Sequence, residues 1–176
     1  MNTDAELLER TIAGDPEAFG DLYNRYKSEL YCYACAILKD HALAEDVLHD
    51  AFIQLYQTGG TIHSPGALRK WLYVVVRRLS LNTLYWHQRS EPLDEDKPSE
   101  EPSPLEIVEQ HTTDEMVQNA IGQLSAGFRE VIFLREYLQL SYAEICEITG
   151  VTLPAIKSKL FKARKALVAV LVPYFH

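Results

Sequence analysis

The sequence predicts an all-α protein of two small helical domains joined by an acidic, proline-rich linker, the C-terminal domain being a helix-turn-helix. Apolar residues recur at three- and four-residue steps through most of the 176 residues, as they do on the buried face of a helix. Four of the eight prolines and six acids fall within residues 91–104. We therefore expect an N-terminal domain over residues 1–90, a linker over 91–104 and a C-terminal domain over 105–176.

The N-terminal domain is expected to hold four helices, over residues 3–13, 16–39, 41–58 and 64–89. Thr3 and Glu6 have the spacing of a capping box, and Asp15 followed by Pro16 is a strong helix start. Gly59 begins the glycine pair that ends the third helix. The apolar stripes expected to face the core contain Phe19, Leu22, Tyr26, Leu30, Tyr33, Ile37, Leu43, Val47, Phe52, Leu55, Leu68, Leu72, Val75, Leu79 and Trp86.

The C-terminal domain is expected to begin with helices over residues 103–122 and 126–137, the second capped by Ser125. A helix-turn-helix follows over residues 141–172. Ser141 and Glu144 can form a capping box, and Gly150 supplies the left-handed residue that ends the first helix. Thr152 is the expected cap of the second. Its expected core stripe is Leu153, Ile156, Leu160, Ala163, Leu167 and Leu171.

The net charge of −8 conceals two basic segments. Residues 91–115 contain ten Asp or Glu and one Lys. Residues 60–90 and residues 151–176 each contain five Lys or Arg and no acid. Because an electrostatic footprint is local, this distribution is compatible with binding to nucleic acid despite the acidic total.

Other classes of protein fit the sequence poorly. No apolar run approaches the roughly 20 residues that span a bilayer, and the polar start MNTDAELLER is unlike a secretory signal. We therefore expect a cytoplasmic protein without stable membrane insertion. No nucleophile elbow, phosphate loop or metal constellation is apparent, so we expect no enzyme, no cofactor and no metal.

Cys32 and Cys35 form a C-x-x-C pair inside an expected helix. No second pair or neighbouring histidine completes a zinc site. Small buried hydrophobic residues are the favoured interpretation, and redox or metal sensing is the alternative.

Three segments carry a resemblance to a known family: ALAEDVLHDAFIQLYQ at 42–57, ALRKWLYVVVRRLSLNTL at 67–84 and LSAGFREVIFLREYLQLSYAEICEITGVTLPAIKSKLFKARKAL at 124–167. In this order, around an acidic linker, they resemble the extracytoplasmic-function (ECF) sigma factors of bacterial RNA polymerase. The resemblance implies that the first two segments belong to region 2, which binds core polymerase and melts and reads the minus-ten element. The third resembles region 4, which reads the minus-thirty-five element.

The resemblance also implies roles for single residues. The polymerase clamp would be contacted by Asp46, His49, Asp50 and Gln54. Minus-ten DNA would be contacted by Arg69, Lys70, Arg77, Arg78 and Asn82, with Tyr73 and Tyr85 as candidates for base stacking and Trp86 assigned to the core. The loop over residues 58–64 would accept a flipped base. Base edges would be approached by Ala155, Ser158, Lys159 and Lys162, and phosphates by Lys157 and Lys165.

Two departures from the family pattern bear on specificity. Family members often have an Asp and a run of arginines where this chain has Asn82 and then YWHQR at 85–89. The recognition helix has Lys where Arg is frequent, and Lys lacks the planar fork that pairs with guanine.

The expected partners are core RNA polymerase, promoter DNA and, through apolar surface on the helix at 64–89, an anti-sigma factor. The acidic linker would follow the RNA path of polymerase, or would screen the two basic segments in the free protein. The alternative function is a helix-turn-helix regulator that binds operator DNA without polymerase.

Overall fold

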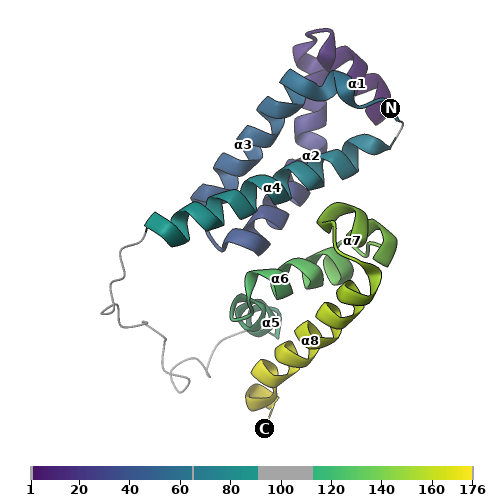
Figure 1. The fold of residues 1–176 in the computed structure, drawn as a ribbon. Helices are drawn as coiled ribbons and strands as arrows, with labels where there is room; N and C mark the ends of the chain where they lie inside the picture. Colours follow the sequence, from purple (N-terminus) through teal and green to yellow (C-terminus); the bar gives the residue numbers. More distant parts are fainter. Residues whose placement is uncertain (1, 65, 91–112, 176) are drawn as a thin grey trace.

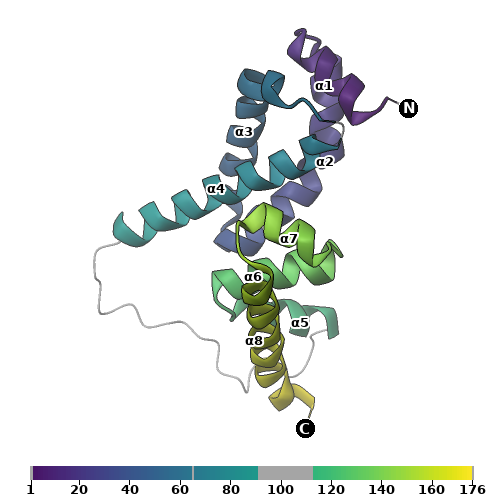
Figure 2. The same cartoon turned by 45° about the vertical axis from the view of Figure 1, so that its right-hand side comes forward.

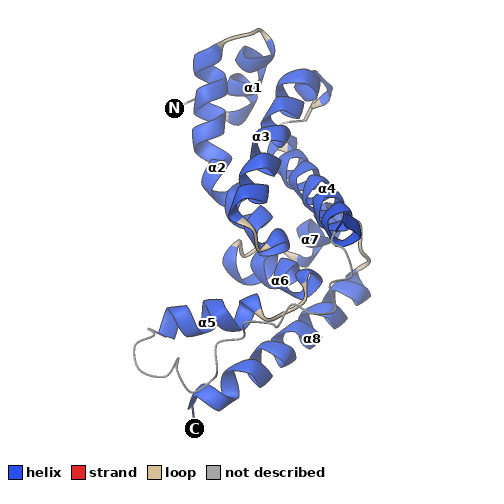
Figure 3. Ribbon diagram, turned by 90° about the vertical axis from the view of Figure 1, so that its left-hand side faces the viewer, coloured by secondary structure: helices blue, strands red, loops and turns tan. Residues whose placement is uncertain are grey.

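The computed structural model describes residues 2–64, 66–90 and 113–175, and every regular element in these ranges is helical (Figure 3). The all-α prediction is therefore confirmed for the described residues. The helices are α1 (Asp4–Ile12), α2 (Pro16–Leu38), α3 (His41–Thr58), α4 (Ala67–Ser90), α5 (Thr113–Gly122), α6 (Ala126–Ile132), α7 (Tyr142–Thr149) and α8 (Leu153–Leu171). The linker and the expected start of the helix at Ser103 lie outside these ranges.

The helices form two groups that lie against each other (Figures 1 and 2). We call residues 2–90, with α1–α4, the N-terminal half, and residues 113–175, with α5–α8, the C-terminal half. In the N-terminal half α2 packs against α1, α3 and α4, and in the C-terminal half α8 packs against α5, α6 and α7. The halves meet where α6 packs on α2 and α7 packs on α4. The side of α8 that faces away from the N-terminal half is therefore left open (Figure 2).

Most helix ends form where local sequence chemistry predicts them. Both expected capping boxes are present, Thr3 with Glu6 and Ser141 with Glu144. Gly150 adopts φ +69°, the left-handed conformation that ends α7 without a Cβ clash. Ser125 and Thr152 occupy the expected N-cap positions of α6 and α8, but the side chain of neither accepts a capping hydrogen bond.

One hydrophobic core runs through both halves. Its buried members in the N-terminal half include Leu22, Phe52 and Leu72, and it continues without a break to Leu134 and Ile156. Burial of apolar surface at about 25 cal/mol per Å² is the main force that holds such helices together. Because the core is continuous, the two halves share part of this stabilisation.

Two residues expected in the core are exposed. Trp86 is 65% exposed because the last turns of α4 extend beyond the neighbouring helices (Figure 2). Leu153 is 44% exposed at the first position of α8. The helix expected to open at Ser64 begins at Ala67 instead. Among the described helices, none combines the length and apolar character needed to cross a membrane.

Candidate functional site

The outer side of α3 presents an acidic face that contains three of the four expected polymerase contacts. Asp46, His49 and Asp50 are exposed, while the intervening Val47 and Leu48 are buried against the core. This separation follows from helical periodicity, which places apolar and polar residues on opposite sides. Both aspartates are thus accessible from outside the chain. The acidic face therefore stays free for a partner.

Two apolar residues lie beside this acidic face. Ile53 is 53% exposed and Tyr56 is 59% exposed. The expected contact residue Gln54 is half-buried, and its Oε1 accepts a hydrogen bond from Arg78 Nη2 at 2.6 Å. Apolar groups inside a charged rim are the usual composition of a protein-binding surface. Sequence reasoning missed both, because their positions fall between the core stripe and the polar side.

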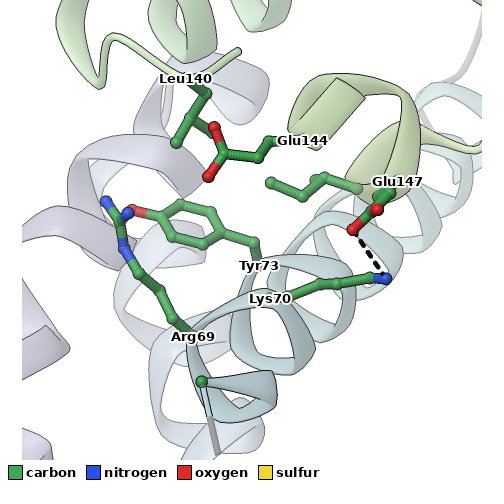
Figure 4. Close-up of a pocket in the computed structure, with 8 residues that line it drawn as sticks. Arg69, Lys70, Tyr73, Leu140, Glu144 and Glu147 are labelled. Carbon is green, nitrogen blue, oxygen red and sulfur yellow. Dashed lines mark ion pairs between the residues drawn. The ribbon is translucent and has the colours of Figure 1, made fainter. Parts of the chain in front are cut away.

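The basic residues of α4 are engaged by other helices. Within the N-terminal half, Arg69 Nη2 lies 2.6 Å from Glu29 Oε1. Across the two halves, Lys70 Nζ lies 2.9 Å from Glu147 Oε2, beside a cavity of about 180 Å³. Figure 4 shows this ion pair among the residues that line the cavity. Farther along α4, Arg77 is paired with a carboxylate of α6. The cations expected to meet DNA are thus present, but in this arrangement they are bound to partners within the chain.

Tyr73 does not lie where a base-stacking residue must lie. Its side chain is 1% exposed, and its hydroxyl donates a hydrogen bond to the carboxylate of Glu29. Burial and this hydrogen bond raise the pKa of Tyr73. The expectation that Tyr73 stacks on a base is corrected, because contacts within the N-terminal half already hold it: its hydroxyl is bound by Glu29 of α2, and its ring packs on Tyr33 with ring centroids 5.2 Å apart.

The exposed end of α4 carries the aromatic residues instead. Tyr85 is 53% exposed and packs edge-to-face with Trp86, the ring centroids lying 6.1 Å apart. Arg89 Nη1 donates to the Tyr85 hydroxyl at 2.6 Å, and Asn82 is exposed one turn earlier. The ring faces and the guanidinium together form a surface suited to unpaired bases.

The loop over residues 58–64 contains a single 3₁₀ turn, Gly59–Thr61. A Cβ on Gly59 would lie 3.3 Å from Leu8 Cδ1, so α1 packs closely on the start of this loop. Beyond it, Thr61, His63 and Ser64 are exposed. The loop is accordingly anchored at its beginning and open toward its end.

The outer side of α8 is basic and exposed. The expected DNA contacts Ala155, Lys157, Ser158, Lys162 and Lys165 are all exposed, and Lys159 is half-buried. Beside them Phe161, which the sequence reasoning left unassigned, is 67% exposed. Arg164 is held by Glu136, whose Oε1 accepts from Arg164 Nε at 2.9 Å. The opposite side packs through Ile156, Leu160 and Ala163, so the basic face is fixed in orientation.

Cys32 and Cys35 are half-buried and line a pocket between the two halves. His41, which the sequence reasoning did not place near them, has its Nδ1 3.8 Å from Cys35 Sγ and 2.7 Å from the Tyr31 hydroxyl. Burial raises the pKa of the Cys35 thiol, which disfavours the reactive thiolate. In the described part of the chain no group of three or more His, Cys, Asp or Glu has the geometry of a metal site.

An exposed acidic face on α3 and an exposed basic second helix of a helix-turn-helix are the features of a transcription factor that contacts both a protein and DNA. Two family models support this class: Sigma-70 region 2 matches residues 22–90, and Sigma-70, region 4 matches residues 114–167. The chain belongs to the sigma-70 family and is an RNA polymerase sigma factor of the ECF group.

The curated relatives agree along nearly the whole chain. The RNA polymerase sigma-H factor of Pseudomonas aeruginosa is 28% identical, with 97% of this chain and 94% of the relative aligned. The ECF RNA polymerase sigma factor SigM of Mycobacterium tuberculosis is 28% identical, with 96% of this chain and 85% of the relative aligned. Factors of this kind direct core RNA polymerase to promoters and assist DNA melting during initiation.

Two solved structures show the same fold. The sigma factor RpoE of Bartonella quintana, in complex with the anti-sigma factor NepR, superposes with a TM-score of 0.68 at 22% identity, over 87% of this chain and 96% of that one. CnrH, in complex with the cytosolic domain of CnrY, has a TM-score of 0.68 at 24% identity, over 98% of this chain and 99% of that one.

Proposed function

We propose that the N-terminal half serves as region 2, which binds core polymerase and opens and reads the minus-ten element, and that the C-terminal half serves as region 4, which reads the minus-thirty-five element. The observation that carries this division is the opposite charge of two exposed helix faces, acidic on α3 and basic on α8. An acidic face suits a protein partner, whereas a basic face suits the phosphate backbone. The linker over residues 91–104 separates the two roles.

On α3 the polymerase contacts are Asp46, His49, Asp50 and Gln54. Ile53 and Tyr56 add apolar area next to them. Charged groups at such a surface mainly set orientation and association rate, while buried apolar groups contribute most of the affinity. We therefore assign both kinds of residue to the polymerase interface.

For minus-ten DNA we assign Arg69, Lys70, Arg77, Arg78 and Asn82 to the backbone, and Tyr85 and Trp86 to base stacking. Stacking on an exposed ring contributes roughly 1–3 kcal/mol per base, which offsets the few kcal/mol needed to unstack a base. A flipped base would enter the open end of the loop over residues 58–64. Trp86 here replaces the buried Tyr73 of the sequence prediction.

For minus-thirty-five DNA, Ala155, Ser158, Lys159 and Lys162 approach base edges, and Lys157 and Lys165 bind phosphates. Phe161 adds an apolar group of the kind that contacts a thymine methyl. The protein then works in the cytoplasm beside polymerase and DNA, and it catalyses no reaction of its own. An anti-sigma factor is a further partner, as it is for the RpoE of Bartonella quintana named above.

Reconstitution with core RNA polymerase tests this assignment. The protein added to core polymerase should give promoter-specific transcripts from genomic fragments, and neither component alone should do so. A regulator that acts without polymerase would instead bind a duplex operator by itself. If no stable complex with core polymerase forms, the assignment is wrong.

A further inference from the structure

Two cysteines of α2 face the same pocket. Cys32 and Cys35 are both half-buried, and both line a cavity of about 630 Å³ between α2 and the helices α5 and α6. A free cysteine that serves only as a small core residue is usually fully buried. The cavity has roughly twenty times the volume that one water molecule occupies in the liquid, so it has room for a small oxidant beside both sulfurs.

The pocket also carries positive charge. Lys39 and Arg129 line it, and both donate to neutral backbone carbonyls: Lys39 Nζ to that of Gly122 at 2.6 Å, and Arg129 to those of the last turn of α2. The lining carboxylate of Glu136 is paired with Arg164. A partly exposed cysteine in positive surroundings is the usual target of oxidants.

Polar partners surround the sulfur of Cys35. The Nδ1 atom of His41, at the first position of α3, lies 3.8 Å from Cys35 Sγ and 2.7 Å from the Tyr31 hydroxyl. A neutral imidazole nitrogen accepts a proton near neutral pH, and a tyrosine hydroxyl donates a hydrogen bond to the thiolate that remains. Burial raises the pKa of the Cys35 thiol, and the hydrogen bond with Tyr31 opposes this rise. Cys35 therefore stays a thiol until a neighbouring base takes its proton.

The spacing of the two cysteines permits a disulfide. From the rise and radius of a helix, residues three positions apart have Cα atoms about 5 Å apart, and disulfides join Cα atoms about 4.4–6.8 Å apart. The Cβ atoms, about 5–6 Å apart in a helix, must approach to about 4 Å. Because α2 ends at Leu38, close after Cys35, its last turn can adjust while the rest of the helix stays in place.

We propose that Cys32 and Cys35 form a reversible disulfide when the protein meets a peroxide, so that this pocket is a redox-modification site. The Cys32 thiolate attacks one oxygen of hydrogen peroxide, the O–O bond breaks, and hydroxide leaves a sulfenic acid on Cys32. Cys35 passes its proton to His41 and attacks the sulfenic sulfur. The S–S bond forms, and the departing hydroxide takes the proton from His41. In sum, two thiols lose two electrons and two protons, and the peroxide becomes two waters.

Peptide mapping tests the disulfide in the full-length protein. Trypsin cleaves after Lys27 and Lys39, so both cysteines fall in the peptide of residues 28–39, while Cys146 falls in another. The protein is treated with hydrogen peroxide and then alkylated with N-ethylmaleimide in urea. The 28–39 peptide should lose both maleimide additions and two hydrogen atoms, and dithiothreitol should restore the alkylated form. Cys146, half-buried in α7, should stay alkylated and serves as the internal control.

Variants separate the two chemical steps. Cys35→Ser should stop at the sulfenic acid of Cys32, which dimedone labels. His41→Gln should slow closure of the disulfide about tenfold while the dimedone-reactive intermediate accumulates. A loss of packing alone would not produce that accumulation. His87→Gln, at an exposed position near the end of α4, is the matched control and should close at the wild-type rate.

Closure of the disulfide should also weaken the end of α2. It bends the turn whose carbonyls, at Ala36 and Ile37, accept hydrogen bonds from Arg129 at 2.7 and 2.8 Å. The oxidised protein should therefore unfold at a urea midpoint about 1 M below that of the reduced protein. Dithiothreitol should restore the midpoint, and peroxide should leave the midpoint of Cys32→Ser unchanged.

The outcomes are distinct. A 28–39 peptide that stays fully alkylated after peroxide treatment would overturn the redox site. Closure at the wild-type rate in His41→Gln would overturn the role of His41, and an unchanged urea midpoint of the oxidised protein would overturn the coupling to the end of α2. None of these measurements involves polymerase or DNA, so failure of the proposed function would leave them as they are.

Discussion

At the scale of single residues, three buried tyrosines join helices through carboxylates. Tyr26 donates its hydroxyl to Asp4, Tyr33 to Glu130 and Tyr73 to Glu29. In each case burial is the main cause that raises the pKa of the tyrosine, and the hydrogen-bonded carboxylate adds to it. Each phenol must remain protonated to donate, so the network depends on pH at the alkaline end.

Alkaline pH should therefore destabilise the protein. The unfolded-state pKa of tyrosine is about 10, and a raised folded-state pKa means that stability is fully present below that pH and falls as the pH rises toward the folded value. Each of the three tyrosines should lower the free energy of unfolding by about 1.4 kcal/mol per pH unit above about pH 10. Tyr33→Phe should reduce the slope by about that amount, measured from urea midpoints between about pH 9 and 11. Tyr56→Phe, at a 59% exposed position, is the control. A wild-type slope in Tyr33→Phe would contradict this account.

Residues that act through local rules were predictable, and residues that join the two halves were not. The capping box of Ser141 and the left-handed Gly150 depend on neighbours within a few positions. Arg129 and Glu130 look like an ordinary polar pair on a short helix, and only the packing of α6 on α2 buries them. The assignment of Trp86 to the core was wrong for a related reason, because helical periodicity does not reveal where a helix extends beyond its neighbours.

At the scale of the element, α3 and α8 are built in the same way but present opposite charges. Each buries an apolar stripe, which fixes its rotation, and thereby directs a charged face outward. The exposure of these faces could be predicted, because the period of 3.6 residues is a local property. The partners of these faces are inferred from the family, because helical periodicity does not identify a partner.

Removal of the charge on α3 should weaken the polymerase complex without loss of the fold. Asp46→Ala with Asp50→Ala deletes two exposed carboxylates and should reduce affinity for core polymerase about tenfold. Thermal unfolding should stay close to wild type, because exposed substitutions change stability by about 0.5 kcal/mol or less. Asp21→Ala removes an exposed carboxylate of α2 and serves as the control. Retained affinity in the double variant would place the interface elsewhere.

Removal of one charge on α8 should change the salt dependence of promoter binding. Each neutralised phosphate contributes about −0.9 to the slope of log K against log salt concentration. Lys165→Ala should therefore weaken binding of the polymerase complex and make the slope less negative by about one unit. Lys27→Ala, on the exposed side of α2, should leave the slope as it is. An unchanged slope in Lys165→Ala would mean that this side chain touches no phosphate.

At the scale of the whole molecule, the structure shows one continuous unit, whereas the proposed function requires two separate readers of DNA. The continuous core holds the two halves together. Two buried residues of α6 add to this contact: Arg129 donates to the carbonyls at the end of α2, and Glu130 accepts from Tyr33 and Arg77. The proposed roles of the two halves at two separate promoter elements require that they part. An interface with buried polar groups suits a reversible contact, because its charged members regain hydration or find phosphate when the halves part. The sequence predicted two domains, but the contact between them arises only from tertiary packing.

Unfolding of the free chain should reveal this unity. Both tryptophans, Trp71 and Trp86, lie on α4, so their fluorescence reports the N-terminal half alone, whereas far-ultraviolet circular dichroism reports all helices. In the wild type the two signals should follow one urea transition. Arg129→Ala leaves the carbonyls at the end of α2 without their donor and should weaken the contact between the halves by about 3 kcal/mol. The fluorescence and circular dichroism transitions should then separate. Arg164→Ala, which removes an exposed ion pair within the C-terminal half, should keep them coincident. Separate transitions in the wild type would mean that the halves fold independently, and coincident transitions in Arg129→Ala would mean that the apolar contacts alone unite them.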